Sequence, residues 1–158
     1  MKRKALLVGL LVCQIGHAKP RIAVLDFELN DITSLPNTVQ ERQRTASIRP
    51  LLEQRLRQDY EIIAIDADAW TNANAGFGYL FRHHELAAEL GQQFGADWVI
   101  VGQHSKPSFL FSYLMVHLIR VKTHGLAARY DIELKGTHAT VTEHGITALS
   151  GKIHDFVK

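Results

Sequence analysis

The sequence contains almost no cysteine. Its 158 residues include one, Cys13. A single cysteine cannot close a disulfide within the chain, and it excludes the multi-cysteine sites that usually hold structural zinc. The fold must therefore depend on an ordinary hydrophobic core, which a chain of this length can supply unaided.

The sequence also lacks a hydrophobic run long enough to span a membrane, although its first residues are apolar. A basic start at residues 2–4 precedes an apolar stretch at 5–12, and Gly16-His17-Ala18 fits a cleavage site that requires small residues. The apolar stretch is too short to cross a bilayer. We expect a signal peptide at residues 1–18, export to the periplasm, and a single α/β domain over residues 19–158.

An alternative is a lipid anchor on Cys13, because Leu10-Leu11-Val12-Cys13 resembles a lipoprotein box. Val12 is bulkier than the small residue that such a site requires directly before the cysteine. Soluble export is therefore favoured over a lipid anchor through Cys13.

Net charge is small as well. The chain has 18 Lys and Arg against 16 Asp and Glu, and without the three basic residues of the signal peptide the two signs nearly balance. Proteins that bind a phosphate backbone need many clustered cations, and no Lys/Arg run occurs beyond the expected signal peptide. Nucleic acid is therefore not an expected partner.

Hydrophobic periodicity predicts alternating strands and helices. The expected strands are 21–29, 60–65, 97–102, 108–121 and 126–135, and the expected helices are 38–58, 83–94 and one from about 141 to 156. The order β-α-β-α-β-β-β-α predicts an α/β (α+β) fold: a single mixed sheet of about five strands, with a C-terminal β-hairpin and helix. Residues 66–79 are expected to form a long loop.

Helix boundaries carry local signals. Thr38 with Glu41 has the spacing of a capping box, and Thr140 with Glu143 repeats it before the last helix. Pro50 is expected to kink the first helix or mark a restart nearby, because proline removes a backbone donor.

Alternation along strands predicts which side chains share a face. In residues 126–135 the apolar side chains, beginning with Leu126, are expected to face the core, while the charged ones face water. Asp26 and Glu28 have the same parity and are expected on one face, where two carboxylates could serve acid–base or cation chemistry. A structural role for Asp26 is favoured.

Four segments, 21–29, 44–52, 95–102 and 106–111, resemble an uncharacterised family of predicted secreted bacterial proteins. More distantly, Ala-Val-Leu-Asp-Phe at 23–27 and Gly-Ala-Asp-Trp-Val-Ile-Val-Gly at 95–102 are similar to the N-terminal domain of the translocation protein TolB and to the curli-secretion lipoprotein. The resemblance implies a βαβ-type envelope domain. It transfers no catalytic residues.

Histidine is abundant, with eight residues beyond the signal peptide. Imidazole is a common metal ligand, and His83, His84 and His104 are the candidates for a shared copper or zinc site. No familiar ligand spacing is present, so surface or capping roles are favoured for the first two. His117 lies within an apolar alternation and is expected to be a hydrogen-bonded core residue.

Four aromatic residues lie in or beside the Gly- and Asn-rich segment: Trp70, Phe77, Tyr79 and Phe81. They either fold back over the sheet as a plug or form a partner-binding surface. No sequence motif identifies an active site. The sequence thus favours a non-catalytic periplasmic domain that acts by protein–protein association, as an accessory of an envelope complex or periplasmic enzyme. A metal- or small-ligand-binding protein is the alternative.

Overall fold

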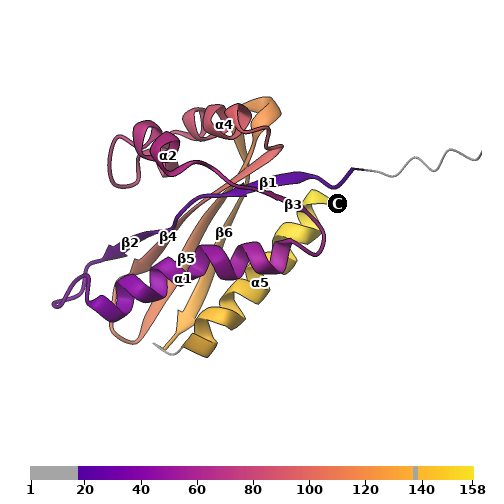
Figure 1. Ribbon diagram of the computed structural model, residues 1–158. Coiled ribbons are helices and arrows are strands. Elements are labelled where there is room, and N and C mark those ends of the chain that lie inside the picture. The colour runs from indigo at the N-terminus through magenta and orange to yellow at the C-terminus, as the bar shows by residue number, and fades with distance from the viewer. Residues whose placement is uncertain (1–17, 137–138) are drawn as a thin grey trace, which may run out of the picture.

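The computed structural model describes residues 18–136 and 139–158 (Figure 1). The strands are β1 (Arg21–Val24), β2 (Glu28–Asp31), β3 (Glu61–Ile63), β4 (Trp98–Lys106), β5 (Phe111–Arg120) and β6 (Gly125–Lys135). The helices are α1 (Val39–Leu56), α2 (Ala67–Ala73), α3 (Tyr79–Arg82), α4 (His84–Gln93) and α5 (Ala139–Val157), with a 3-10 turn η1 at Val121–Thr123. The signal-peptide prediction for residues 1–18 lies almost wholly outside the described residues.

All the described strands belong to one mixed sheet. Its order is β3-β1-β4-β5-β6, and β2 pairs with β4 beyond the end of β1. The pairs β1–β3, β1–β4 and β2–β4 are parallel, whereas β4–β5 and β5–β6 are antiparallel. The prediction of a single mixed sheet with a C-terminal hairpin and helix is confirmed.

Helices cover both faces of the sheet (Figure 1). Helices α1 and α5 pack on one face, where Ile48 and Leu149 share a buried cluster with Ile100 of β4. Helices α2, α3 and α4 pack on the other, where Leu90 shares a second buried cluster with Val99. Successive residues of β4 thus enter opposite cores, which explains why the strand reads as a continuous apolar run.

The first expected strand, 21–29, is broken into β1 and β2. Asp26 lies exposed at the break and pairs with Arg49 of α1, with Oδ1 3.3 Å from the guanidinium. Glu28 instead accepts hydrogen bonds from Gly78 N (2.7 Å) and Asn74 Nδ2 (3.2 Å), which belong to the opposite helical layer. The expectation that the two carboxylates share one face is wrong, because the break between β1 and β2 interrupts the alternation.

The expected loop at 66–79 contains helix α2. Asp66 caps it, since Oδ1 accepts hydrogen bonds from Asp68 N and Ala69 N at 3.0 and 3.1 Å. Thr38 caps α1 as predicted, accepting from Glu41 N at 3.3 Å. Helix α1 continues through Pro50, so the predicted restart is wrong.

Two further expectations fail near the C-terminus. A β-bulge between Leu118 and Ile119 shifts the β5–β6 register, which places Leu126 opposite Ile119 and leaves it exposed. Thr140 lies inside α5, so it is not the cap residue of that helix. Ile146, Leu149 and Ile153 of α5 are buried against the sheet, whereas Phe156 near its end is 47% exposed.

Two glycines of α5 offer a matched test of this packing. A methyl group at Gly145 would lie 2.3 Å from Leu134 Cδ2 of β6, whereas one at Gly151 would meet nothing within 4 Å. We expect Gly151→Ala to raise the free energy of unfolding by about 0.5–1 kcal/mol through helix propensity. Gly145→Ala should lower it by about 1–3 kcal/mol through overpacking. Urea unfolding would measure both, and equal effects would contradict the packing of α5 on β6.

Candidate functional site

Large apolar side chains are exposed at one end of the sheet. The β2–α1 loop and the start of α1 carry Ile32, Leu35 and Val39, and the β4–β5 turn carries Phe109 and Leu110. These five side chains, called the apolar tip below, are between 50% and 78% exposed. The two loops adjoin, because Ile32 N donates a hydrogen bond to Lys106 O at 3.2 Å.

The β2–α1 loop is held in place by one carboxylate. Asp31 Oδ1 accepts hydrogen bonds from Thr33 N (3.1 Å) and Thr33 Oγ1 (2.7 Å), and Oδ2 accepts from Asn37 N at 3.0 Å. Burial alone would raise the pKa of Asp31, yet these hydrogen bonds hold it below its ordinary value. The loop that presents Ile32 and Leu35 is therefore pinned at both ends.

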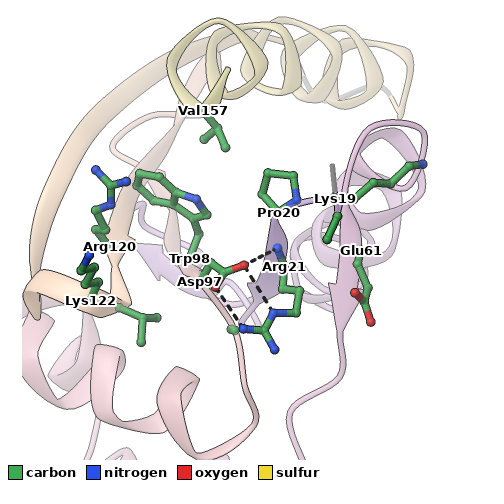
Figure 2. Close-up of a pocket in the computed structure, with 12 residues that line it drawn as sticks. Lys19, Pro20, Arg21, Glu61, Asp97, Trp98, Arg120, Lys122 and Val157 are labelled. Carbon is green, nitrogen blue, oxygen red and sulfur yellow. Dashed lines mark hydrogen bonds and ion pairs between the residues drawn. The ribbon is translucent and has the colours of Figure 1, made fainter. Parts of the chain in front are cut away.

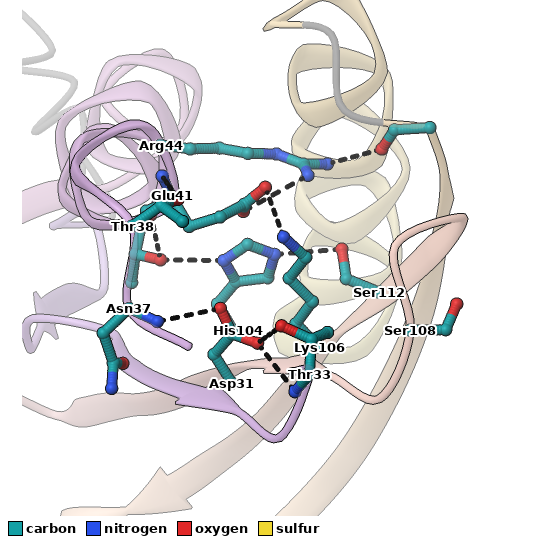
Figure 3. A network of polar contacts seen from close by, with 12 residues as sticks. Asp31, Thr33, Asn37, Thr38, Glu41, Arg44, His104, Lys106, Ser108 and Ser112 are labelled. Carbon is teal, nitrogen blue, oxygen red and sulfur yellow. Dashed lines mark hydrogen bonds and ion pairs between the residues drawn. The ribbon is translucent and has the colours of Figure 1, made fainter. Parts of the chain in front are cut away.

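Beneath the tip lies a buried cluster of charged side chains (Figure 3). Lys106 Nζ lies 2.9 Å from Glu41 Oε1, and an Arg44 guanidinium nitrogen lies 3.7 Å from Glu41 Oε2. Arg44 also donates to Thr142 Oγ1 at 2.8 Å and to Gly136 O at 3.2 Å. Burial lowers the pKa of Arg44, and the charge of Glu41 opposes that shift. The cluster joins α1, the end of β4 and the start of α5.

His104 occupies the interior next to this cluster (Figure 3). Its Nδ1 lies 2.7 Å from Thr45 Oγ1, and its Nε2 lies 2.9 Å from Ser112 Oγ. Thr45 Oγ1 also donates to Glu41 O at 2.8 Å, which uses its one hydrogen, so we infer that Nδ1 of the ring donates and Nε2 accepts from Ser112. Burial, and then the nearby charge of Arg44, lower the pKa of His104 to about 4.

The Ser112–His104 pair has the spacing of a nucleophile and its base, but it lacks access. His104 is 0% and Ser112 is 1% exposed, so a substrate cannot reach either in this conformation. A hydroxyl–imidazole bond in such a place satisfies buried polar groups and cross-links β4 to β5. Sequence reasoning missed this pair because the expected strand 97–102 ends before His104, and only the pairing of β4 with β5 brings His104 to Ser112.

The four aromatic residues proposed as a partner surface divide into two groups. Trp70, Tyr79 and Phe81 are partly buried and pack against the core beneath α2–α4. Phe77 is 53% exposed on the loop between α2 and α3. Only Phe77 of the four thus presents most of its side chain to solvent.

The structure does not bring His83, His84 and His104 together. His83 Nδ1 lies 3.4 Å from Glu85 Oε1, and His84 Nε2 lies 3.0 Å from His117 Nδ1. His104 bonds to Thr45 of α1, on the opposite face of the sheet. Within residues 18–136 and 139–158, no three His, Cys, Asp or Glu side chains are grouped to hold a metal ion. His117 is a buried, hydrogen-bonded histidine, as predicted.

A pocket of about 720 Å³ lies at the other end of the sheet, beside Pro20 and Val157 (Figure 2). Arg21 and Asp97 form a two-point ion pair there, with one N–O distance of 3.1 Å and another of 3.4 Å. Arg120 covers the ring of Trp98 at 4.9 Å from its centroid. Hydrogen bonds from Arg21 outweigh burial and lower the pKa of Asp97. Arg21, Asp97 and Arg120 in the pocket wall thus already interact with other side chains of the wall.

These features define an α/β fold with helices on both faces of one mixed sheet and a buried ion cluster under an apolar tip. The chain belongs to the DUF3280 family, described as "Protein of unknown function (DUF2380)", whose model matches residues 20–153. None of the curated proteins matches this sequence.

Solved structures share the fold. TolB from Acinetobacter baumannii has a TM-score of 0.56 at 14% identity, covering 90% of this chain and 29% of that one. Lipoprotein GNA1162 from Neisseria meningitidis gives 0.55 at 12% identity, covering 87% and 99%. The LpoB C-terminal domain from Salmonella enterica gives 0.51 at 16% identity, covering 77% and 87%. The predicted distant similarity to TolB is confirmed.

Among the described residues, no helix is both long and apolar enough to cross a membrane.

The buried histidine predicts a pH dependence of stability. Between the ordinary pKa of 6.5 and about 4, the unfolded chain binds a proton on His104 that the folded chain does not. The free energy of unfolding should therefore fall as the pH is lowered through this range, by up to about 3 kcal/mol from this residue. Burial, and then the charge of His84, also lower the pKa of His117, which adds to the same slope.

Urea unfolding between about pH 7 and pH 4.5 would measure this dependence. His104→Gln should flatten the slope, while the exposed His144→Gln should leave it unchanged. An unaltered slope in His104→Gln would contradict a neutral, buried His104.

Proposed function

We propose that this protein is an exported, non-catalytic accessory of an envelope complex or periplasmic enzyme, and that it binds its protein partner through the apolar tip. The observation that carries the proposal is the gathering of Ile32, Leu35, Val39, Phe109 and Leu110 on two adjoining segments above a buried ion cluster. Clustered exposed apolar side chains are typical of interaction surfaces, whereas single ones are ordinary.

Pre-organisation supports the proposal. The tip segments are fixed by the Asp31 hydrogen bonds on one side and by Lys106 on the other, whose Nζ also lies 5.4 Å from the Phe109 ring centroid. A surface that is already ordered loses less conformational entropy on binding, so more of the burial energy appears as affinity. Apolar residues on an unsupported loop would bind less well.

Export to the periplasm is part of the same proposal. It rests on the signal-peptide pattern of the sequence and on the shared fold with a protein named as a lipoprotein. The described chain starts at the end of the sheet that lies far from the tip (Figure 1). An interaction surface at the opposite end would stay accessible whatever precedes β1.

Site-specific crosslinking tests the tip. A photo-crosslinking amino acid at Leu110 should capture the partner in intact cells, because this side chain is 78% exposed within the tip. The same substitution at Leu126 is the matched control, since Leu126 is an exposed leucine on β6, away from the tip. We further expect Leu110→Ser to weaken partner binding more than about tenfold with little change in melting temperature.

The same adducts at both positions, or undiminished binding by Leu110→Ser, would contradict the assignment to the tip. A purified protein that turns over a substrate would overturn the non-catalytic part of the proposal.

The aromatic residues give a second comparison. Trp70 packs against the core beneath α2–α4 while Phe77 is exposed. Trp70→Ala should therefore lower the free energy of unfolding by about 2 kcal/mol or more, and Phe77→Ala should change it little. If Phe77 belongs to the partner surface, Phe77→Ala should weaken partner capture while its thermal melt stays cooperative. Unchanged capture would remove Phe77 from the surface, and equal destabilisation would contradict its exposed position.

A further inference from the structure

Two potential ligand atoms, one from α3 and one from α4, lie close to Nδ1 of His117 in the middle of β5. His84 Nε2 lies 3.0 Å from His117 Nδ1, and Phe81 O lies 3.1 Å from the same Nδ1. The ring of Phe81 stacks on that of His117, with centroids 3.9 Å apart and planes 19° apart, which fixes the orientation of the buried imidazole. Neither the sequence motifs nor the apolar tip accounts for this arrangement.

The spacing of these atoms matches the edge of a metal coordination shell. Imidazole nitrogens bind Zn²⁺ and similar ions at about 2.0–2.1 Å, so adjacent ligands lie about 2.9 Å apart in square geometry and about 3.3 Å apart in tetrahedral geometry. The observed 3.0 and 3.1 Å fall within this interval. Small ring movements would let both nitrogens face one ion.

The side chains beside the two rings are paired with one another. From β6, Arg129 lies opposite His117 in the strand register, and its charge is paired with Asp131 at 3.3 Å. His83 and Glu85 flank His84 and pair with each other at 3.4 Å. Neither pair includes His84 or His117, so the two imidazoles remain in contact with each other.

We propose that His84 and His117, with the carbonyl oxygen of Phe81, form a binding site for one divalent copper ion, with water completing its coordination. Nitrogen and oxygen donors in tetragonal geometry favour Cu²⁺, which also binds most tightly among the first-row divalent ions. The site replaces His104 and His83 of the sequence-based candidate with His117. It is independent of the apolar tip, so either proposal can fail alone.

Copper binding to the untagged full chain tests the site. All proteins would carry Cys13→Ser, so that no thiol competes for the ion. Calorimetric titration with Cu²⁺ should show one site tighter than about micromolar, and electron paramagnetic resonance should show hyperfine coupling to two imidazole nitrogens. His84→Gln and His117→Gln should each weaken binding at least tenfold and remove one coupled nitrogen.

His124→Gln and His144→Gln, which change exposed histidines, are the matched controls and should bind copper as the parent does. Because His117 is buried, a loss of binding in His117→Gln is interpreted only beside His84→Gln, which changes a half-buried residue and whose thermal melt shows that it is folded. Binding weaker than about 10 micromolar in the parent, or equal affinity in folded His84→Gln, would overturn the site.

Discussion

The ion pair between Glu41 and Lys106 is the contact on which the apolar end of the molecule depends. It joins the first turn of α1 to the last residue of β4, with both side chains buried. Removing one partner would leave an uncompensated buried charge, which costs far more than the loss of a surface pair. Arg44 extends the contact to α5 through Thr142. Three elements that are distant in sequence are thereby locked around one carboxylate.

The buried ion pair fixes the arrangement of the tip more than it raises the free energy of unfolding. Well-packed apolar side chains in the same volume would hold the layers together as strongly, because desolvation offsets much of the attraction in a buried ion pair. An ion pair is directional, so Lys106 can meet Glu41 in few arrangements. The backbone oxygen of Lys106 is then placed to accept a hydrogen bond from Ile32 N. Asp31 orders the rest of the loop. The exposed Ile32 and Leu35 therefore stand on a support whose shape is determined by polar contacts, as a selective binding surface requires.

Hydrophobic periodicity was enough to predict the sheet and its covering helices, because buried strands such as β4 and the inward face of α5 carry long apolar patterns. Details that depend on single polar contacts were not predictable in this way. The cap at Asp66 turns an apparently irregular segment into α2, and one extra residue at the bulge reverses Leu126. No sequence pattern pairs Glu41 with Lys106, since only the tertiary structure brings them together. The apolar tip was missed for the same reason, as its two segments are about seventy residues apart.

The two faces of the sheet use histidine in different ways, and the difference follows from what each face lacks. Next to the ion cluster, each ring nitrogen of His104 is hydrogen-bonded to a hydroxyl group, so neither nitrogen is left to bind another group. On the other face, His117 has a backbone carbonyl and a second imidazole at nearly equal distances from one nitrogen. A single hydrogen on that nitrogen serves two acceptors less well than one, whereas a metal ion in place of the hydrogen would accept a lone pair from each of the three atoms. The same side chain is thus a closed structural link on one face and an open set of donors on the other.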